Sequence, residues 1–286
     1  MTNQDIILVT GATGQQGGAI ARELLAHGYR VKAMTRKPEG EKARELVRLG
    51  AEVVQGDLND EASLDRALKG AWGVFAVQNT WEAGVEQEEV QGKRLAEIAK
   101  KAGVHHFVYS SVASADRKTG IPHFENKWRI EQRISELAFP SYVILRPVFF
   151  MENLYSPSFK PGIDQGKLFV GLEPATALQM ISVQDIGKYG LLAFEKHAQL
   201  NGRAIDIAGD EKTMPGTAQV LSQSTKKTIT FERVPIEEVK KFSVDFALML
   251  EWFDRVGYSA KIADNANEFR IEPTTLAQWA GRQNWA

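Results

Sequence analysis

Ile6-Ile7-Leu8-Val9-Thr10-Gly11-Ala12-Thr13-Gly14-Gln15-Gln16-Gly17 is the stretch of sequence that decides the fold. Its first residues are apolar and mostly β-branched, which predicts a buried strand. The apolar residues over 19–25 have helical spacing, and Gly28 would end that helix. Three glycines therefore lie between a strand and a helix.

Each glycine of this loop suits a different requirement of a phosphate-binding turn. Gly11 permits a tight turn, Gly14 lets the backbone approach a pyrophosphate, and Gly17 lets the helix pack closely on the strand. The first turn of the helix then offers free N–H groups to the phosphates. A glycine-rich turn without a ligand is the alternative, but the strand–loop–helix context favours dinucleotide binding. The predicted binding residues are Gly11, Ala12, Thr13, Gly14, Gln15, Gln16 and Gly17.

Strands and helices continue to alternate as far as residue 146. This alternation predicts βαβ units, and hence a Rossmann-type, doubly wound parallel α/β sheet with helices on both faces. Strands are expected at 6–10, 30–35, 52–55, 73–77, 107–111 and 142–146, with helices at 41–49, 63–68, 86–102 and 127–137.

The rhythm changes near Val148, where prolines and glycines break the chain into short pieces. We therefore expect a dinucleotide-binding domain over 1–150 and a smaller C-terminal, substrate-side lobe over 151–286. Strand patterns at 205–207 and 228–234 and a helical pattern at 236–255 suggest that part of this lobe returns to the main sheet.

Composition excludes several classes of protein. The chain has 35 Lys and Arg against 36 Asp and Glu, a net charge of −1, so direct nucleic-acid binding through a broad basic field is not expected. It has no cysteine, which excludes disulfides, zinc–thiolate sites and a catalytic thiol, and no metal site is predicted. Neither a leader nor an apolar segment of membrane-spanning length is evident, so we expect a cytoplasmic protein without a membrane contact.

The end of the second predicted strand favours NADP(H) over NAD(H). NAD enzymes place an acidic residue there to accept the ribose 2′-hydroxyl. This chain has Arg36 and Lys37 instead, and the first carboxylate comes only at Glu39. A guanidinium and an ammonium group suit a 2′-phosphate, although a solvated basic turn is the alternative. Asp57, followed by Leu58, stands where an adenine amino group is often bound, or it caps the next helix.

Short-chain dehydrogenases use Tyr-x-x-x-Lys on a helix, with a serine at the end of the preceding strand. Here Ser110 and Ser111 end the strand, but the motif reads His123-Phe124-Glu125-Asn126-Lys127. Lys127 is expected to hold the cofactor ribose. His123 is a catalytic candidate with a shorter reach than a phenol and a different pKa, or a histidine without a special role.

Several motifs in order along nearly the whole chain resemble the NmrA-like family of atypical short-chain dehydrogenases. They include GATGQQGG, TRKP, VVQGDLND, QNTWE, HFENK and FFMENL, and the similarity extends to TLAQW near residue 279. The chain is most similar to the redox-sensor branch of the family, which also carries His-Phe-x-x-Lys.

This resemblance implies NADP(H) as cofactor and assigns further contacts to it. Two departures stand out: Glu39 and Gly40 replace further basic residues of the sensor branch, and Gln78–Thr80 lacks an aromatic residue found in relatives. The resemblance implies cofactor contacts from Arg36, Lys37, Asp57, Leu58, Gln78, Asn79, Thr80, Lys127, Phe150, Met151, Glu152 and Asn153.

Three functions remain open at this level. The first is a regulator that binds NADP(H) and signals its redox state to a protein partner. The second is an NADPH-dependent reductase of quinones or other small carbonyl compounds, whose oxygens water can protonate. A sugar-nucleotide epimerase-like protein is the third, and the missing tyrosine argues against it. The sequence leaves the oligomeric state open.

Overall fold

The computed structural model describes residues 4–285, and a seven-stranded sheet is its main feature. The strand order is β10-β6-β5-β4-β1-β2-β3, and the pairs from β3 through to β6 are all parallel. The doubly wound α/β fold predicted from the sequence is confirmed. The strands are β1 Ile6–Val9, β2 Arg30–Thr35, β3 Glu52–Gln55, β4 Ala71–Ala76, β5 His106–Ser110, β6 Ser141–Pro147 and β10 Ala204–Ile207.

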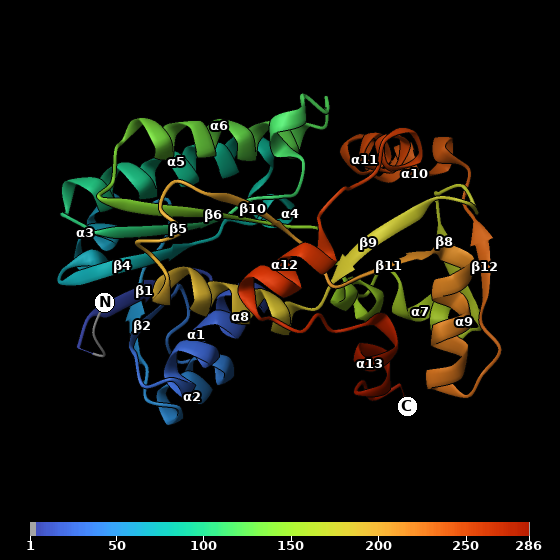
Figure 1. Ribbon diagram of the computed structural model, residues 1–286, viewed down its shortest axis with the longest axis horizontal. Helices are drawn as coiled ribbons and strands as arrows, with labels where there is room; N and C mark the ends of the chain where they lie inside the picture. The colour runs from blue at the N-terminus through green and yellow to red at the C-terminus, as the bar shows by residue number, and fades with distance from the viewer. Residues whose placement is uncertain (1–3, 286) are drawn as a thin grey trace. The chain divides into compact units, whose positions relative to one another are not determined.

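Two layers of helices cover this sheet, with α3, α5 and α6 on one face and α1, α2 and α8 on the other (Figure 1). Small residues allow close packing within each layer: Gly92 of α5 lies against Ile130 of α6, and Gly190 of α8 lies against Ile20 of α1. The helices are α1 Gln15–Ala26, α2 Glu41–Arg48, α3 Glu61–Leu68, α5 Val85–Lys101, α6 Pro122–Glu136 and α8 Val183–Glu195.

The sheet has its switch point between β1 and β4. From β1 the chain proceeds outward through β2 and β3, and from β4 it proceeds outward on the other side through β5 and β6. Loops that leave the carboxyl ends of β1 and β4 therefore run in opposite directions, and open α/β sheets bind ligands at such a switch point.

The chain divides into two compact units, each made of discontinuous segments. The first comprises Met1–Ala115, His123–Arg146 and Ile186–Ile205, and the second comprises Asp116–Pro122, Pro147–Asp185 and Asp206–Ala286.

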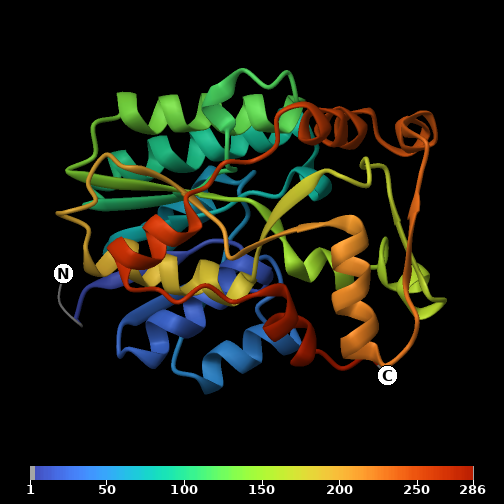
Figure 2. The ribbon, with the colours of Figure 1, turned by 45° about the vertical axis from the view of Figure 1, so that its right-hand side comes forward.

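The second unit contains two small sheets and several helices. One sheet has the order β11-β9-β7 and the other pairs β12 with β8, while α9 contacts β8, β12 and α13 (Figure 2). Its elements are β7 Phe149–Phe150, α7 Lys160–Asp164, β8 Lys167–Val170, β9 Ala177–Ile181, β11 Asp210–Thr213, α9 Met214–Thr225, β12 Thr230–Arg233, α10 Ile236–Phe242, α11 Val244–Arg255, α12 Ile262–Phe269 and α13 Leu276–Gly281.

Two helices differ most from the sequence-based expectation. Helix α6 begins at Pro122, five residues before the predicted start, because proline is well tolerated in a first helical turn. The helix expected over 236–255 is two helices, since Ser243 is extended and its hydroxyl accepts a hydrogen bond from the Phe246 amide at the start of α11. None of the helices within residues 4–285 combines the length and apolar character needed to cross a membrane.

A buried histidine lies at the amino end of β5, opposite the end of the sheet that carries the glycine loop. His106, at the start of β5, is fully buried, with Nδ1 3.0 Å from Ser141 Oγ and Nε2 3.0 Å from the Ala193 carbonyl oxygen. Burial and, to a smaller extent, the nearby His197 together lower the pKa of His106 to about 3. The folded chain therefore holds this imidazole neutral.

We predict that acid destabilises the protein through His106. The pKa of His106 in the folded protein lies below the usual 6.5. The stability that the neutral imidazole contributes is therefore fully present above pH 6.5 and is lost as the pH falls towards 3. The free energy of unfolding should fall by about 1.4 kcal/mol per pH unit in this window from this one group. Urea unfolding of His106→Gln should show a shallower pH dependence than the wild type, and the exposed-site control His27→Gln should not. Equal slopes for all three proteins would contradict the assignment.

Candidate functional site

The glycine loop joins β1 to α1, and its geometry explains two of its three glycines. Gly11 has φ of +57°, a left-handed conformation that favours glycine. A Cβ at Gly17 would lie 2.3 Å from the Gly11 carbonyl oxygen and 2.5 Å from that of Thr10. Both neighbours are backbone atoms, so the helix can approach the strand this closely only with glycine at position 17.

The outer side of the loop is open. Gly11, Gly14 and Gln15 are exposed, whereas Ala12 and Gly17 are buried. Gly14 begins α1 without a side-chain cap, so the amides of the first turn remain available to an anion. A Cβ at Gly14 would already lie 3.1 Å from the Gly11 carbonyl oxygen. The loop is thus a shallow cradle of backbone with a helix amino terminus at its base.

Gln78 lies beside this cradle and carries an unsatisfied amide. It follows β4, which pairs with β1, and its side chain is 6% exposed. Neither its Oε1 nor its Nε2 has a hydrogen-bond partner among the described residues. An unpaired buried amide is costly, so this side chain marks a place where a polar ligand would be stabilising.

Other residues of the loop make contacts to neighbouring strand ends. The Ser110 hydroxyl, at the end of β5, donates to Gln16 Oε1 at 2.5 Å. Thr13 Oγ1 lies 3.4 Å from Thr35 Oγ1, at the end of β2. Ser111 is buried, and its hydroxyl has no partner within residues 4–285.

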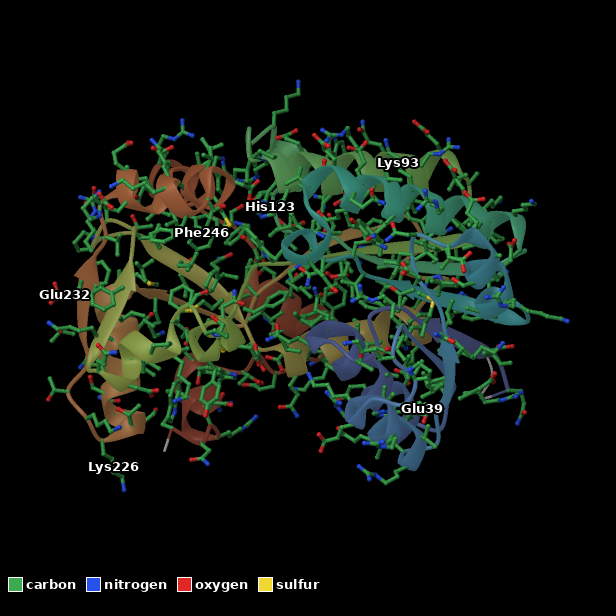
Figure 3. All side chains as sticks on the ribbon, turned by 180° about the vertical axis from the view of Figure 1, so that it is seen from behind. Glu39, Lys93, His123, Lys226, Glu232 and Phe246 are labelled. Atoms are coloured by element: carbon green, nitrogen blue, oxygen red, sulfur yellow. The ribbon has the colours of Figure 1, made fainter. Side chains whose placement is uncertain are left out.

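Arg36 extends from the end of β2 and forms an ion pair with Glu82. Glu82 belongs to α4 Thr80–Ala83, the short helix that follows β4. The hydrogen bond to Glu82 raises the pKa of Arg36, and Asp57 adds a smaller effect in the same direction. Lys37 is exposed, and Glu39 (labelled in Figure 3) lies on the exposed turn before α2.

Asp57 does not cap the helix that follows it. Helix α3 begins after Asp60, whose side chain accepts from the Ala62 amide, while Asp57 Oδ1 accepts from the Asn59 amide at 2.9 Å. The capping alternative for Asp57 is therefore wrong. Its role towards an adenine stays a prediction, as does that of Leu58, which packs partly against the core.

His123 and Lys127 are both on α6, one turn apart (Figure 3 labels His123). His123 is 7% exposed, and its ring centroid lies 5.5 Å from that of Trp81 and 4.8 Å from that of Phe124. The imidazole thus lies among aromatic rings on a regular helix.

Lys127 belongs to a buried polar network. Its Nζ lies 2.8 Å from Oε1 of Glu88, whose side chain is fully buried, and 5.8 Å from the centre of the Tyr109 ring. Glu88 also accepts a hydrogen bond from the hydroxyl of Thr80. Burial, followed by the charges of Glu88 and Glu131, raises the pKa of Tyr109 well above its usual value. A fully buried phenol with a raised pKa is a weak proton donor, so Tyr109 does not replace the missing phenol.

The sequence analysis assigned no role to Glu88 or to Glu82, although Glu82 lies in the motif QNTWE. Glu88 lies in the acidic run Glu86-Gln87-Glu88-Glu89, which reads as a solvated helix face, and its burial becomes evident only when α5 packs against α6. Asn79 was predicted to contact the cofactor, and its side chain accepts from the Trp81 amide at 3.1 Å. Asn79 thus caps helix α4, and Thr80, also predicted to contact the cofactor, is its first residue.

The segment Phe150–Asn153 lies in the second unit. There Glu152 accepts hydrogen bonds from the Val183 amide at 3.0 Å and from Trp279 Nε1 at 3.0 Å. Met151 is buried, and burial raises the pKa of Glu152. These contacts give Glu152 a role in its own unit, and the predicted cofactor contacts of Phe150, Met151, Glu152 and Asn153 stay predictions.

Comparison with known proteins identifies the family. The NmrA-like family model matches residues 3–280, and the chain belongs to this family. An NmrA-like family domain-containing protein of Dictyostelium discoideum is 29% identical over 88% of each chain. A (4-alkanoyl-5-oxo-2,5-dihydrofuran-3-yl)methyl phosphate reductase of Streptomyces griseus is 31% identical, over 82% of this chain and 79% of the relative.

Solved structures share the fold at lower identity. The triphenylmethane reductase of Citrobacter sp., complexed with NADP(H), has a TM-score of 0.81 at 22% identity, over 98% of this chain and 99% of the other. The negative transcriptional regulator NmrA in complex with NADP has a TM-score of 0.80 at 20% identity, over 98% and 95%. The same fold thus occurs in a reductase and in a regulator.

We predict that Lys127 stabilises the folded protein, in addition to any role in ligand binding. Lys127→Met would leave the buried Glu88 carboxylate without its cation, which costs about 3–5 kcal/mol of unfolding free energy. The double variant Lys127→Met, Glu88→Gln should recover most of this loss in urea unfolding. Lys93→Met removes the more exposed cation 2.5 Å from Glu89 and should cost less than about 1 kcal/mol. Equal stabilities of the two single variants would contradict a buried pair at Lys127.

Proposed function

We propose that this chain binds NADP(H) at the carboxyl ends of β1, β2 and β4 and acts as a sensor of the dinucleotide's redox state. The observation that carries the binding proposal is the open backbone cradle of Gly11–Gly17 with the unpaired, buried amide of Gln78 beside it. A pyrophosphate would accept from the free amides at the start of α1, and a polar group of the ligand would satisfy Gln78. These residues fit the group that the family implies.

Arg36 supports the phosphorylated cofactor. Its guanidinium is at the end of β2, where a ribose 2′-substituent is recognised in this fold, and 60% of its side chain is exposed. It can form charge-assisted, two-pronged hydrogen bonds with a 2′-phosphate, whereas a 2′-hydroxyl offers it much less. The side chain of Lys37 adds a second positive charge.

A role as sensor is supported by the residues around His123. NADPH supplies a hydride when it is bound, but a carbonyl reductase of the usual type also needs a phenol at this position to protonate the product. This chain has a largely buried imidazole there, while Tyr109 is buried and its pKa is raised. Lys127, with three N–H donors, can hold Glu88 and a ribose hydroxyl together without transferring a proton.

A reductase is the second candidate, and one comparison favours it. The Streptomyces griseus relative, aligned over 82% of this chain, is named as a reductase of an unsaturated lactone phosphate. For such substrates or for quinones, water can protonate the product, so the chain would need only to bind and orient the two reactants.

The cofactor assignment predicts a selective effect of Arg36→Gln. NADPH affinity measured by calorimetry should fall about ten-fold to a hundred-fold, the value of a charge-assisted hydrogen bond, while NADH affinity should change little. Arg48→Gln, which removes the same charge at the far end of α2, is the control. Equal losses for NADPH and NADH would contradict the role of Arg36.

Turnover distinguishes a sensor from a reductase. We expect the wild-type protein to bind NADPH and to leave it unoxidised when it is incubated with a panel of quinones and unsaturated lactones. The absorbance of the reduced nicotinamide is the measurement. Sustained oxidation that the loop variant Gly14→Val abolishes would establish the reductase and overturn the sensor.

A further inference from the structure

Three consecutive side chains of helix α4 contact two predicted functional residues directly and a third, Lys127, through its ion-pair partner. Thr80 donates to Glu88, the partner of Lys127; Trp81 packs near His123; and Glu82 pairs with Arg36. The pair Arg36–Glu82 concerns cofactor choice, because it engages the one guanidinium that the proposed function assigns to the 2′-phosphate.

The strand order determines where this ion pair lies. Arg36 follows β2 and Glu82 follows β4, and these two strands flank β1, from which the glycine loop emerges. The pair therefore links the two strand ends on either side of the loop. A dinucleotide that lies on the loop and reaches Arg36 with its ribose meets the Glu82 carboxylate at the same guanidinium.

The charge of the ribose 2′-substituent determines whether it competes with Glu82 for Arg36. A ribose 2′-phosphate carries close to two negative charges at neutral pH, and it would compete with the Glu82 carboxylate for Arg36 and be repelled by it. A 2′-hydroxyl is neutral and does not require the ion pair to break. Asp57 also attracts Arg36 and raises its pKa slightly, so a second carboxylate favours the charged guanidinium before any ligand binds.

We propose that Glu82 is a specificity-determining residue, which lowers the preference for NADP(H) over NAD(H) by competing with the 2′-phosphate for Arg36. The proposal rests on the proposed function, because it requires that the dinucleotide bind on the Gly11–Gly17 loop. In this arrangement the cation of the phosphate site follows β2 and the competing anion belongs to α4.

The test compares Glu82→Gln with the wild type in calorimetric titrations with NADPH, NADH, adenosine 2′,5′-bisphosphate and ADP. The neutral amide keeps the shape of the side chain and removes its charge. Affinity for the two ligands with a 2′-phosphate should rise about five-fold, the upper value of an exposed ion pair, and affinity for the other two should stay within about two-fold. The gain should shrink as salt is raised from about 0.05 M to about 0.5 M, since salt screens exposed charges.

Two controls exclude a general effect of charge or of α4 packing. Glu86→Gln removes an exposed carboxylate four residues further along and should leave all four affinities unchanged. In an Arg36→Gln background, Glu82→Gln should no longer favour the ligands with a 2′-phosphate, because the group under competition is gone. Equal gains for all four ligands, or the same gain without Arg36, would overturn the proposal.

The outcomes also separate this proposal from the proposed function. A wild-type protein that binds none of the four ligands would contradict dinucleotide binding itself. A wild-type protein that prefers NADPH, with an unchanged preference in Glu82→Gln, would leave the proposed function intact and refute the role of Glu82.

Discussion

The close approach of α1 to the end of β1 is the constraint on which the rest of the site depends. A Cβ at Gly17 would lie 2.3 Å from a backbone oxygen, so no other residue lets the helix begin at this place. The helix start directs its free amides over the loop, and the left-handed Gly11 turns the chain into it. Because β1 is central in the sheet, the ends of β2 and β4 are then brought to either side of this cradle.

A second layer of organisation comes from buried charge. Lys127 and Glu88 compensate each other beneath the site, and Thr80 connects this pair to the start of α4. Arg36 and Glu82 form the corresponding pair at the surface, with both side chains more than half exposed. Separating the buried pair would leave two buried charges unpaired, which is costly. The exposed pair is weak, so another anion can readily replace the carboxylate of Glu82. The network is thus rigid near Lys127 and adaptable near Arg36.

Local patterns were sufficient to predict the first six strands, the helices between them and the glycine loop, because hydrophobic periodicity and glycine positions are local properties. They also singled out Arg36, His123 and Lys127. They could not reveal that Glu88 is buried or that Glu82 reaches Arg36, since both facts arise from contacts between elements distant in sequence. In the second unit, short strands such as β7 and β11 are formed by pairing partners rather than by their own sequence pattern.

Hydrogen–deuterium exchange of the full chain, with and without saturating NADPH, tests the central claim most directly. Binding at the proposed site requires slower exchange in the peptides that cover Gly11–Gly17 and Gln78–Thr80, because their amides and side chains would contact the cofactor. The peptide that covers β12, Thr230–Arg233, serves as an internal reference within the second unit. Protection of the loop and of the Gln78 segment is the result that this account predicts. Demonstrable NADPH binding with unchanged exchange over Gly11–Gly17 would contradict it.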